Sequence, residues 1–342
     1  MFIPLTNKSN FYSQKLTGDY LRLYNASVDN LSHGKYSTTV TFGSDIGEEI
    51  QSGIDAIFEA IIFGCPELFF VKQGQKDKDK EKGISYSYAG RQVSLEFANK
   101  YQQDVSDLWN ILDTEINRIV GIVKKIPNKI EQIHRINQYL CARVKTNSST
   151  EGRFGDAYGA LILKEARCEG YAKAAKLILD RVGFDSIIAY GRALSGGGQE
   201  DHAWNIIEVN GNYYHFDFTW NSGRSQHGIP GQEYMFLDDD TAKIEHFPHH
   251  TYPVCADKTK MFWVKNNGIV KYHSDLSRIK IVPFKNNYLG MAKYDSPLSK
   301  EDLEENIFKW MRNELAGHNY GSQLSYSINE RLNLLIFYFI NQ

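Results

Sequence analysis

Residues 201–220 read DHAWNIIEVNGNYYHFDFTW, in which two apolar and aromatic runs stand on either side of the pair Asn210-Gly211. An Asn-Gly pair between two such runs is the strongest short-range signal of a two-residue β-hairpin turn. The sequence therefore predicts two antiparallel strands joined by a tight turn at this pair.

The register of this hairpin brings a histidine and a carboxylate to the same face. Counted outward from the turn, His202 stands opposite Thr219 and Trp204 stands opposite Asp217. His202 and Asp217 are then diagonal neighbours, typically about 7–8 Å apart, and their side chains can reach one another across that gap. A charge between two phenylalanines of a strand needs a partner, so we predict that Asp217 fixes the tautomer of His202.

A second feature is the run CEGYAKAAKLILDRV, which predicts a helix that begins at Cys168 and ends at Gly183. A cysteine at a helix N-terminus forms its thiolate more readily, because unpaired backbone N–H groups and the helix dipole stabilise negative charge. A catalytic cysteine also needs a base, and the base needs an orienting partner. His202 and Asp217 are residues of the right types for these two roles.

The run AYGALILKEARCEGYAKAAKLIL at residues 157–179, followed by residues 201–220, resembles the bacterial transglutaminase-like domains. The resemblance covers about Ile130 to Asn221. It implies an α+β fold with a papain-like core, in which a nucleophile helix packs on an antiparallel sheet, and with α/β additions at both ends of the chain.

The resemblance also assigns roles to individual residues. It implies a catalytic triad of Cys168 as nucleophile, His202 as general base and Asp217 as orienting acid. Other family motif positions fall on structural or site-lining residues, of which we expect three to bind substrate: these are Tyr171, Trp204 and Trp220, while Gly170 is a further motif position.

The activity that the resemblance implies is acyl transfer at a peptide or protein amide through a thioester. The thiolate attacks the carbonyl, an amine leaves, and water or a second amine resolves the thioester. We expect a protease or amidase ahead of a transamidating enzyme, with the N–H of Cys168 as one oxyanion donor. No cofactor and no metal are expected.

Several alternatives stay open at this stage. The domain could be a catalytically silent scaffold for protein binding, or an enzyme that processes its own chain. His215 could replace His202 as the base, and the triad residues could instead ligate a metal, although their spacing is a poor zinc pattern. The histidines near residue 246 resemble a metal-binding tract, but we expect them to form a polar exit from the core: they are His246, His249 and His250.

The chain is predicted to contain three segments: an N-terminal accessory α/β unit at 1–100, a transglutaminase-like catalytic core at 101–250, and a C-terminal α+β unit at 251–342. In the last segment the pattern predicts a hairpin around Asn266, Asn267 and Gly268, a helix at 301–315 capped by Ser299, and a strand at 332–340. The oligomeric state is left open.

Composition narrows the class of protein. The 342 residues carry 39 Lys and Arg against 41 Asp and Glu, which is typical of an ordinary globular protein and gives no indication of nucleic-acid binding. The mixed-charge run at 72–82 predicts a solvated loop. No stretch has the length of a membrane span or the pattern of a secretion signal. Four widely separated cysteines suggest a reducing compartment, so we expect a cytoplasmic protein.

Overall fold

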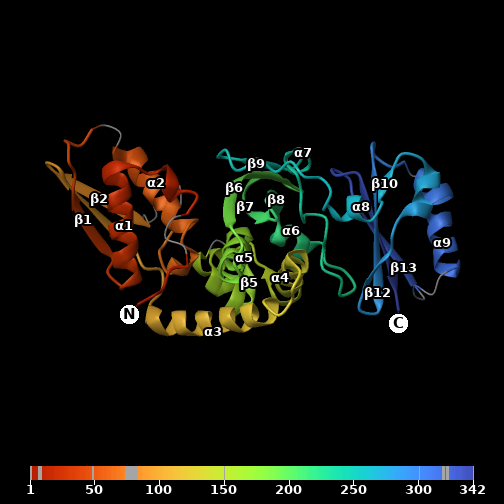
Figure 1. The fold of residues 1–342 in the computed structure, drawn as a ribbon, viewed down its shortest axis with the longest axis horizontal. Coiled ribbons are helices and arrows are strands. Elements are labelled where there is room, and N and C mark those ends of the chain that lie inside the picture. Colours follow the sequence, from red (N-terminus) through yellow and green to blue (C-terminus); the bar gives the residue numbers. More distant parts are fainter. Residues whose placement is uncertain are drawn as a thin grey trace. The chain divides into compact units, whose positions relative to one another are not determined.

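The computed structural model describes residues 2–6, 10–47, 50–73, 83–149, 151–299, 301–317, 320 and 323–341. The chain divides into two compact units, Met1–Tyr190 with His202–Glu208, and Gly191–Asp201 with Val209–Gln342. Helices and strands are mixed in both, as expected for an α+β protein (Figure 1). The predicted three-segment division stays a prediction, because the boundary between the compact units falls inside two strands of the predicted core.

The first unit is largely helical and holds most of the predicted core. Its elements are η1 (Ser13–Lys15), α1 (Gly18–Ser32), β1 (Ser37–Thr41), α2 (Ile50–Ile62), η2 (Pro66–Leu68), β2 (Ile84–Ala89), β3 (Gln92–Phe97), α3 (Val105–Val123), α4 (Lys129–Arg143), β4 (Lys145–Thr146), η3 (Gly152–Gly155), the π-helix η4 (Gly159–Leu163), β5 (Glu165–Ala166) and α5 (Cys168–Val182).

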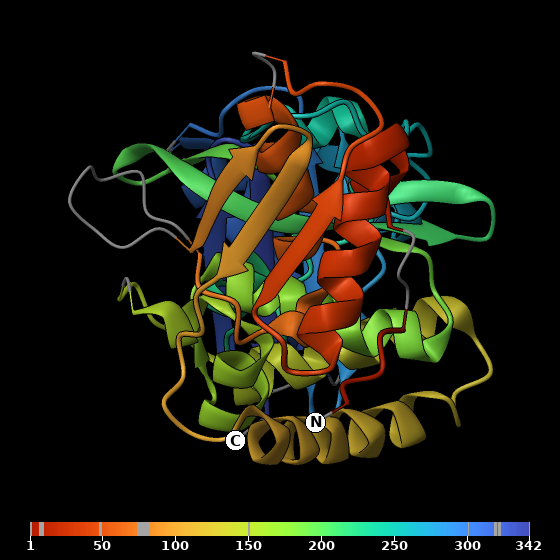
Figure 2. The same cartoon turned by 90° about the vertical axis from the view of Figure 1, so that its left-hand side faces the viewer.

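The N-terminal part of this unit is an antiparallel sheet in the order β1-β3-β2, with α1 beside β1 and against α2 (Figures 1 and 2). Polar and apolar or aromatic side chains alternate at 84–88 and 91–97, a pattern that predicts strands, and β2 and β3 lie at these positions. The sequence did not indicate α1, in which the polar Ser27 and Ser32 are buried beside apolar residues and interrupt the apolar stripe. Most of the mixed-charge run, residues 74–82, lies outside the described residues.

Helix caps explain where α3 and α4 begin. The carboxylate of Asp104 accepts a hydrogen bond from the N–H of Ser106 at 2.7 Å, and the side-chain oxygen of Asn128 accepts from Ile130 at 2.9 Å. Such side chains satisfy N–H groups that have no partner within the helix. Apolar residues at helical spacing predict both helices from the sequence, and most of these residues are buried, among them Leu112 and Ile116 in α3 and Ile133 and Ile136 in α4.

Helix α5 is pinned at its start by a glycine. A Cβ at Gly170 would lie 2.7 Å from the carbonyl oxygen of Phe154 and 3.0 Å from that of Asp156. These contacts are with backbone atoms, which cannot swing aside as a flexible side chain can. Gly170 therefore allows the first turn of α5 to pack directly on the segment at 154–156.

The hairpin predicted at Asn210-Gly211 is present. Strand β7 (Gly198–Val209) ends and β8 (Asn212–Phe216) begins at this pair, where both residues have positive φ, 55° and 86°. Two residues with positive φ are the signature of a type I′ turn, whose twist matches that of the strands. Strands β6 (Ser186–Ser195) and β9 (His246–Pro248) complete a four-stranded sheet in the order β8-β7-β6-β9.

The second unit contains β8, β9 and a further sheet formed by β10 to β14. Its remaining elements are α6 (Phe218–Gly223), α7 (Asp239–Ala242), α8 (Phe262–Lys265), β10 (Ile269–Val270), η5 (His273–Arg278), β11 (Val282–Phe284), β12 (Asn287–Tyr294), the π-helix η6 (Asp302–Ile307), α9 (Phe308–Gly317), β13 (Gln323–Asn329) and β14 (Leu334–Ile340). The helix and final strand predicted for the C-terminal segment correspond to η6 with α9 and to β14, and Ser299 caps the helix through the N–H of Asp302 at 3.0 Å.

The apolar run of β14 is explained by burial on both faces. This strand lies inside a sheet of order β10-β12-β14-β13, with β11 also paired to β12. Leu335, Phe337 and Phe339 pack with residues of η6 and α9, while the alternate residues 334, 336 and 338 pack with α8. Because successive side chains point to opposite faces, a strand covered on both sides is apolar throughout.

The hairpin predicted at Asn267-Gly268 is wrong. These residues end helix α8: the N–H of Gly268 donates to the carbonyl of Trp263 at 2.6 Å, and that of Asn267 donates to Val264 at 3.2 Å. This pair of bonds, with Asn267 at a φ of 56°, is the Schellman motif. An Asn-Gly pair supplies positive φ, which serves a helix end as well as a hairpin turn.

Within the described ranges, no helix is both long enough and apolar enough to cross a bilayer.

The contacts of Gly170 generate a stability prediction. Gly170→Ala is expected to lower the free energy of unfolding by about 1–3 kcal/mol, because its methyl group overlaps fixed carbonyl oxygens. Gly121→Ala in α3 is the matched control, since no atom lies within 4 Å of its Cβ position. That variant is expected to be neutral or more stable by about 0.5–1 kcal/mol through helix propensity. Urea unfolding of both variants measures the difference, and equal stabilities would contradict the prediction.

Candidate active site

Cys168 is the first residue of α5, as predicted. The preceding residue, Arg167, occupies the N-cap position with extended backbone, and its side chain makes no capping hydrogen bond. The first four N–H groups of a helix have no partner within the helix, and Ser, Thr, Asp or Asn usually satisfies one of them. Because the side chain of Arg167 makes no capping hydrogen bond, it does not neutralise the positive end of the helix dipole. That end of the helix lies at Cys168 and can act on the thiol and on a ligand bound next to it.

The start of α5 is fixed to β7 within the first unit. Cys168 packs against a cluster of Ala172, Ile188 and Ala203. The side-chain amide of Asn205 also donates to the carbonyl oxygen of Ala172 at 3.0 Å. These contacts join the first turns of the helix to the part of β7 that carries His202, the immediate neighbour of Ala203.

His202 lies within β7 and is buried. Its ring stacks on that of Trp204, with centroids 6.2 Å apart and planes 18° apart, as expected for residues i and i+2 on one face of a strand. The stacking limits the orientations open to the imidazole.

Asp217 follows β8 and is only 2% exposed. It does not lie within a strand, as the sequence had suggested, because the chain turns into α6 at Phe218. Its Oδ1 accepts the N–H of Trp220 at 2.9 Å, the bond of a helix N-cap. The predicted pairing of His202 with Thr219 is therefore wrong, since Thr219 belongs to α6.

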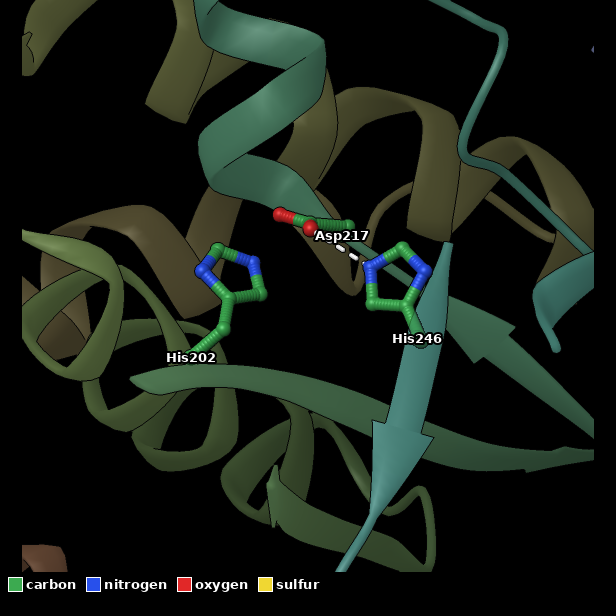
Figure 3. A group of neighbouring side chains, drawn as sticks. All are labelled: His202, Asp217 and His246. Carbon is green, nitrogen blue, oxygen red and sulfur yellow. Dashed lines mark hydrogen bonds and ion pairs between the residues drawn. The ribbon is translucent and has the colours of Figure 1, made fainter. Parts of the chain in front are cut away.

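The second carboxylate oxygen of Asp217 lies 3.0 Å from Nε2 of His246, a residue that is 3% exposed (Figure 3). An ionised carboxylate only accepts hydrogen bonds, so Nε2 carries the proton whenever Asp217 is charged. Strand pairing of His246 with Ala193 holds the imidazole in place, and its ring lies 4.5 Å from that of Trp220.

The sequence did not indicate the role of His246. The sequence pattern places it with His249 and His250 in a polar exit from the core. The pairing of β9 with β6 and the burial of its side chain distinguish His246 from the other two. The sequence contains one sign of this role. Asp217 stands between Phe216 and Phe218, and a carboxylate in such apolar surroundings needs hydrogen-bond donors from the protein.

Two groups of described residues have ligand-type atoms close enough to hold a metal ion, within 4.8 Å of one another. The first is His202, Asp217 and His246, drawn together in Figure 3. The second is a separate group at the end of β8, made of His215, Asp239 and Cys255. The Asp217–His246 hydrogen bond gives the first group a role that needs no metal.

The three residues predicted to bind substrate differ in burial. Tyr171 is 0% exposed and its hydroxyl donates to the carbonyl of Val144 at 2.7 Å, while Trp204 is 1% exposed. Such buried rings pack the core and present almost no surface to a ligand. Trp220 is only partly buried and its ring lies beside that of His246 at a tilt of 48°, so among the three it has the most surface to offer a substrate. The substrate-binding roles stay predictions.

The four cysteines fall into two classes. Cys65 and Cys255 are buried, and burial raises the pKa of both thiols, that of Cys65 to about 12. Cys141 and Cys168 are partly exposed. Thiols held protonated in the core react slowly, so the nucleophile predicted from the sequence is one of the two accessible ones.

Comparison with known proteins supports the resemblance. Residues 117–218 match the profile of the transglutaminase-like superfamily, and this segment includes Cys168, His202 and Asp217. The likeness to transglutaminase-like domains is therefore confirmed for this part of the chain. No curated protein sequence matches the chain.

Two solved structures are similar to parts of the chain. One is described as a TGase, with 12% identity and a TM-score of 0.30 over 56% of this chain and 52% of that one. The other is described as a candidate cysteine protease from Cytophaga hutchinsonii, with 13% identity and a TM-score of 0.28 over 40% of this chain and 61% of that one. The matched regions span between half and two thirds of those chains.

The two hydrogen bonds of Asp217 can be separated by mutation. Asp217→Asn keeps an oxygen that caps α6, whereas Asp217→Ala leaves the N–H of Trp220 and the imidazole of His246 without this acceptor. We expect Asp217→Ala to be less stable than Asp217→Asn by about 1–3 kcal/mol. Chemical unfolding checks this difference; if both variants unfold at the same denaturant concentration, the capping role is wrong.

Proposed function

We propose that this protein is a cysteine-dependent enzyme that transfers acyl groups from peptide or protein amides through a thioester on Cys168. The observation that carries the proposal is the position of Cys168 as the first residue of α5, partly exposed, behind an N-cap without a capping side chain. This arrangement supports both thiolate formation and stabilisation of an oxyanion by the first N–H groups of the helix.

In this proposal His202 is the base and Asp217 its orienting acid. The imidazole of His202 takes the thiol proton of Cys168, and the resulting thiolate attacks the amide carbonyl carbon. The tetrahedral intermediate collapses when His202 returns the proton to the departing amine, leaving an acyl thioester. Water then gives its proton to His202 and attacks the thioester, which releases the acid and restores the thiol.

His246 adds a positioning residue to this set. A carboxylate that accepts from Trp220 through one oxygen and from His246 through the other has little freedom to rotate. A fixed carboxylate in turn supports one orientation and one tautomer of the catalytic imidazole. His246 therefore acts through Asp217 rather than on the substrate.

The choice of acceptor decides the reaction class. Attack by water makes the enzyme a protease or amidase, and attack by a second amine makes it a transamidating enzyme. Hydrolysis is our leading proposal, because water needs no second binding site. The substrate is a peptide or protein amide, and Trp220 is the aromatic residue with surface available to contact it.

The proposal is tested by alkylation of each cysteine across pH, followed by mass spectrometry. Cys168 is expected to react at mildly acidic pH roughly tenfold or more faster than Cys141, because a neighbouring imidazolium and the helix dipole favour its thiolate. Cys65 and Cys255 are expected to stay unmodified until the protein is unfolded. His202→Ala is expected to remove the advantage of Cys168 while leaving Cys141 unchanged.

Cys141 is the matched control, since it is the other partly exposed cysteine; its Sγ lies 3.5 Å from Oδ1 of Asn137. If Cys168 and Cys141 react alike at every pH, the thiolate mechanism is wrong. If Cys168 is fast and His202→Ala changes nothing, the nucleophile stands but the base is another residue.

His246 makes a prediction of its own. His246→Leu removes the donor to Asp217 and is expected to lower the alkylation rate of Cys168 by several-fold at mildly acidic pH. His246→Gln keeps an N–H donor at a similar distance and is expected to restore much of the rate. A purely structural role would lower thermal stability in both variants without this difference in the pH profile, and that result would exclude positioning through Asp217.

A further inference from the structure

A second group of His, Asp and Cys lies within the second unit and shares no residue with the proposed reaction. Nε2 of His215 lies 2.9 Å from Oδ1 of Asp239, and the ligand-type atoms of His215, Asp239 and Cys255 all lie within 4.8 Å of one another. The three come from the end of β8, the first residue of α7 and the segment that follows β9. They are separated by 24 and 16 residues in sequence, so tertiary structure alone brings them together.

Backbone hydrogen bonds hold each member of the group in place. His215 and Leu237 exchange two N–H to carbonyl bonds, at 2.9 and 3.0 Å. The N–H of Asp239 donates to the carbonyl of Cys255 at 2.8 Å, and the N–H of Cys255 donates to Oδ2 of Asp239 at 3.1 Å. The side chains are therefore presented by a fixed frame.

The surroundings of Cys255 are unusual for a packing residue. A buried cysteine is ordinarily a small apolar filler, yet this thiol lies beside a carboxylate and an imidazole. Burial, followed by the charges of Asp239 and Asp238, raises the pKa of the thiol. The hydrogen bond from His215 holds the pKa of Asp239 below its usual range, so this carboxylate is an anion at neutral pH.

A divalent cation would suit this set of groups. Thiolate, imidazole and carboxylate are the three ligand types that zinc takes in proteins, and three protein ligands with one open position are typical of a zinc site that keeps a water. Donor atoms around a tetrahedral zinc ion are about 3.5 Å apart, as follows from bonds of about 2.0–2.3 Å. The group needs shifts of about an ångström to reach this arrangement.

We propose that His215, Asp239 and Cys255 form a binding site for a divalent transition-metal ion of the zinc class. On binding, the Sγ–H bond of Cys255 breaks, its proton goes to solvent, and sulfur bonds the metal. The imidazole of His215 gives up its hydrogen bond to Asp239, and the proton on Nε2 is lost to solvent while Nδ1 carries the remaining ring proton, so that the freed lone pair of Nε2 bonds the metal; Asp239 ligates through a carboxylate oxygen. The side chain of Asp239 is 29% exposed, which leaves room for water as the fourth ligand.

The bound ion would cross-link three segments of the second unit. It would tie the end of β8 to α7 and to the segment around Cys255, adding metal bonds to the hydrogen bonds that join them. Because Asp217 follows His215 by two residues, the same cross-link would steady the turn that carries the proposed orienting acid. In this inference the site takes no part in the chemistry at Cys168.

The test uses the full chain, stripped with a chelator and titrated with Co²⁺ alone. A thiolate ligand gives cobalt a charge-transfer absorption in the near ultraviolet, and Zn²⁺ should displace it because zinc binds such sites more tightly. We expect saturable absorption in the wild type, its loss in Cys255→Ala, and at least about tenfold weaker binding in Asp239→Asn. Zn²⁺ should also raise the melting temperature of the wild type but not of Asp239→Asn.

Matched variants identify the thiolate. Cys168→Ala and Cys141→Ala are expected to keep the cobalt absorption, and Cys65→Ala controls for the other buried thiol. If the wild type gives no absorption, or if Cys255→Ala retains it, the site does not exist. Loss of the absorption in Cys168→Ala instead would place the metal at the proposed active site and overturn this inference. Asp239→Asn keeps the buried cysteine, so it tests the site even if Cys255→Ala fails to fold.

Discussion

The buried carboxylate of Asp217 is the constraint on which the proposed active site depends. An ionised carboxylate that is removed from water must accept hydrogen bonds from the protein, because the loss of hydration is otherwise several kcal/mol too costly. Asp217 satisfies this need through the first turn of α6 on one side and through His246 of β9 on the other. The turn from strand to helix at Phe218 and the pairing of β9 with β6 therefore follow from one electrostatic requirement.

The start of α5 imposes a complementary constraint. Cys168 is useful at a helix terminus only if the N–H groups of that terminus are left available, and the arginine at the cap leaves them so. The close approach at Gly170 fixes this terminus against the carbonyls of residues 154–156. A rigid helix start, rather than the thiol alone, distinguishes Cys168 from the partly exposed Cys141, which lies near the end of α4.

The two Asn-Gly pairs have the same local sequence but form different structures. Asn210-Gly211 and Asn267-Gly268 both provide positive φ, and the first forms the predicted hairpin while the second ends a short helix. The difference lies in what flanks them: apolar strands on both sides of the first, and the aromatic helix residues Phe262 and Trp263 before the second. Local chemistry specifies the backbone conformation of such a pair, and tertiary packing decides which structure uses it.

The sequence by itself determined the mixed α+β class, the helix that begins at Cys168, the hairpin at 210–211 and the three residues of the proposed triad, because each rests on a local pattern of period, cap or turn. It did not determine that Asp217 caps a helix, that His246 is its partner, or that His215, Asp239 and Cys255 lie together. The cap joins Asp217 to a residue only three positions away, but it forms only because the chain leaves β8 at Asp217. The hydrogen bonds of His246 and of the His215, Asp239 and Cys255 group join residues 16 to 29 positions apart along the chain, and bonds over such separations depend on strand pairing and burial that no local pattern encodes.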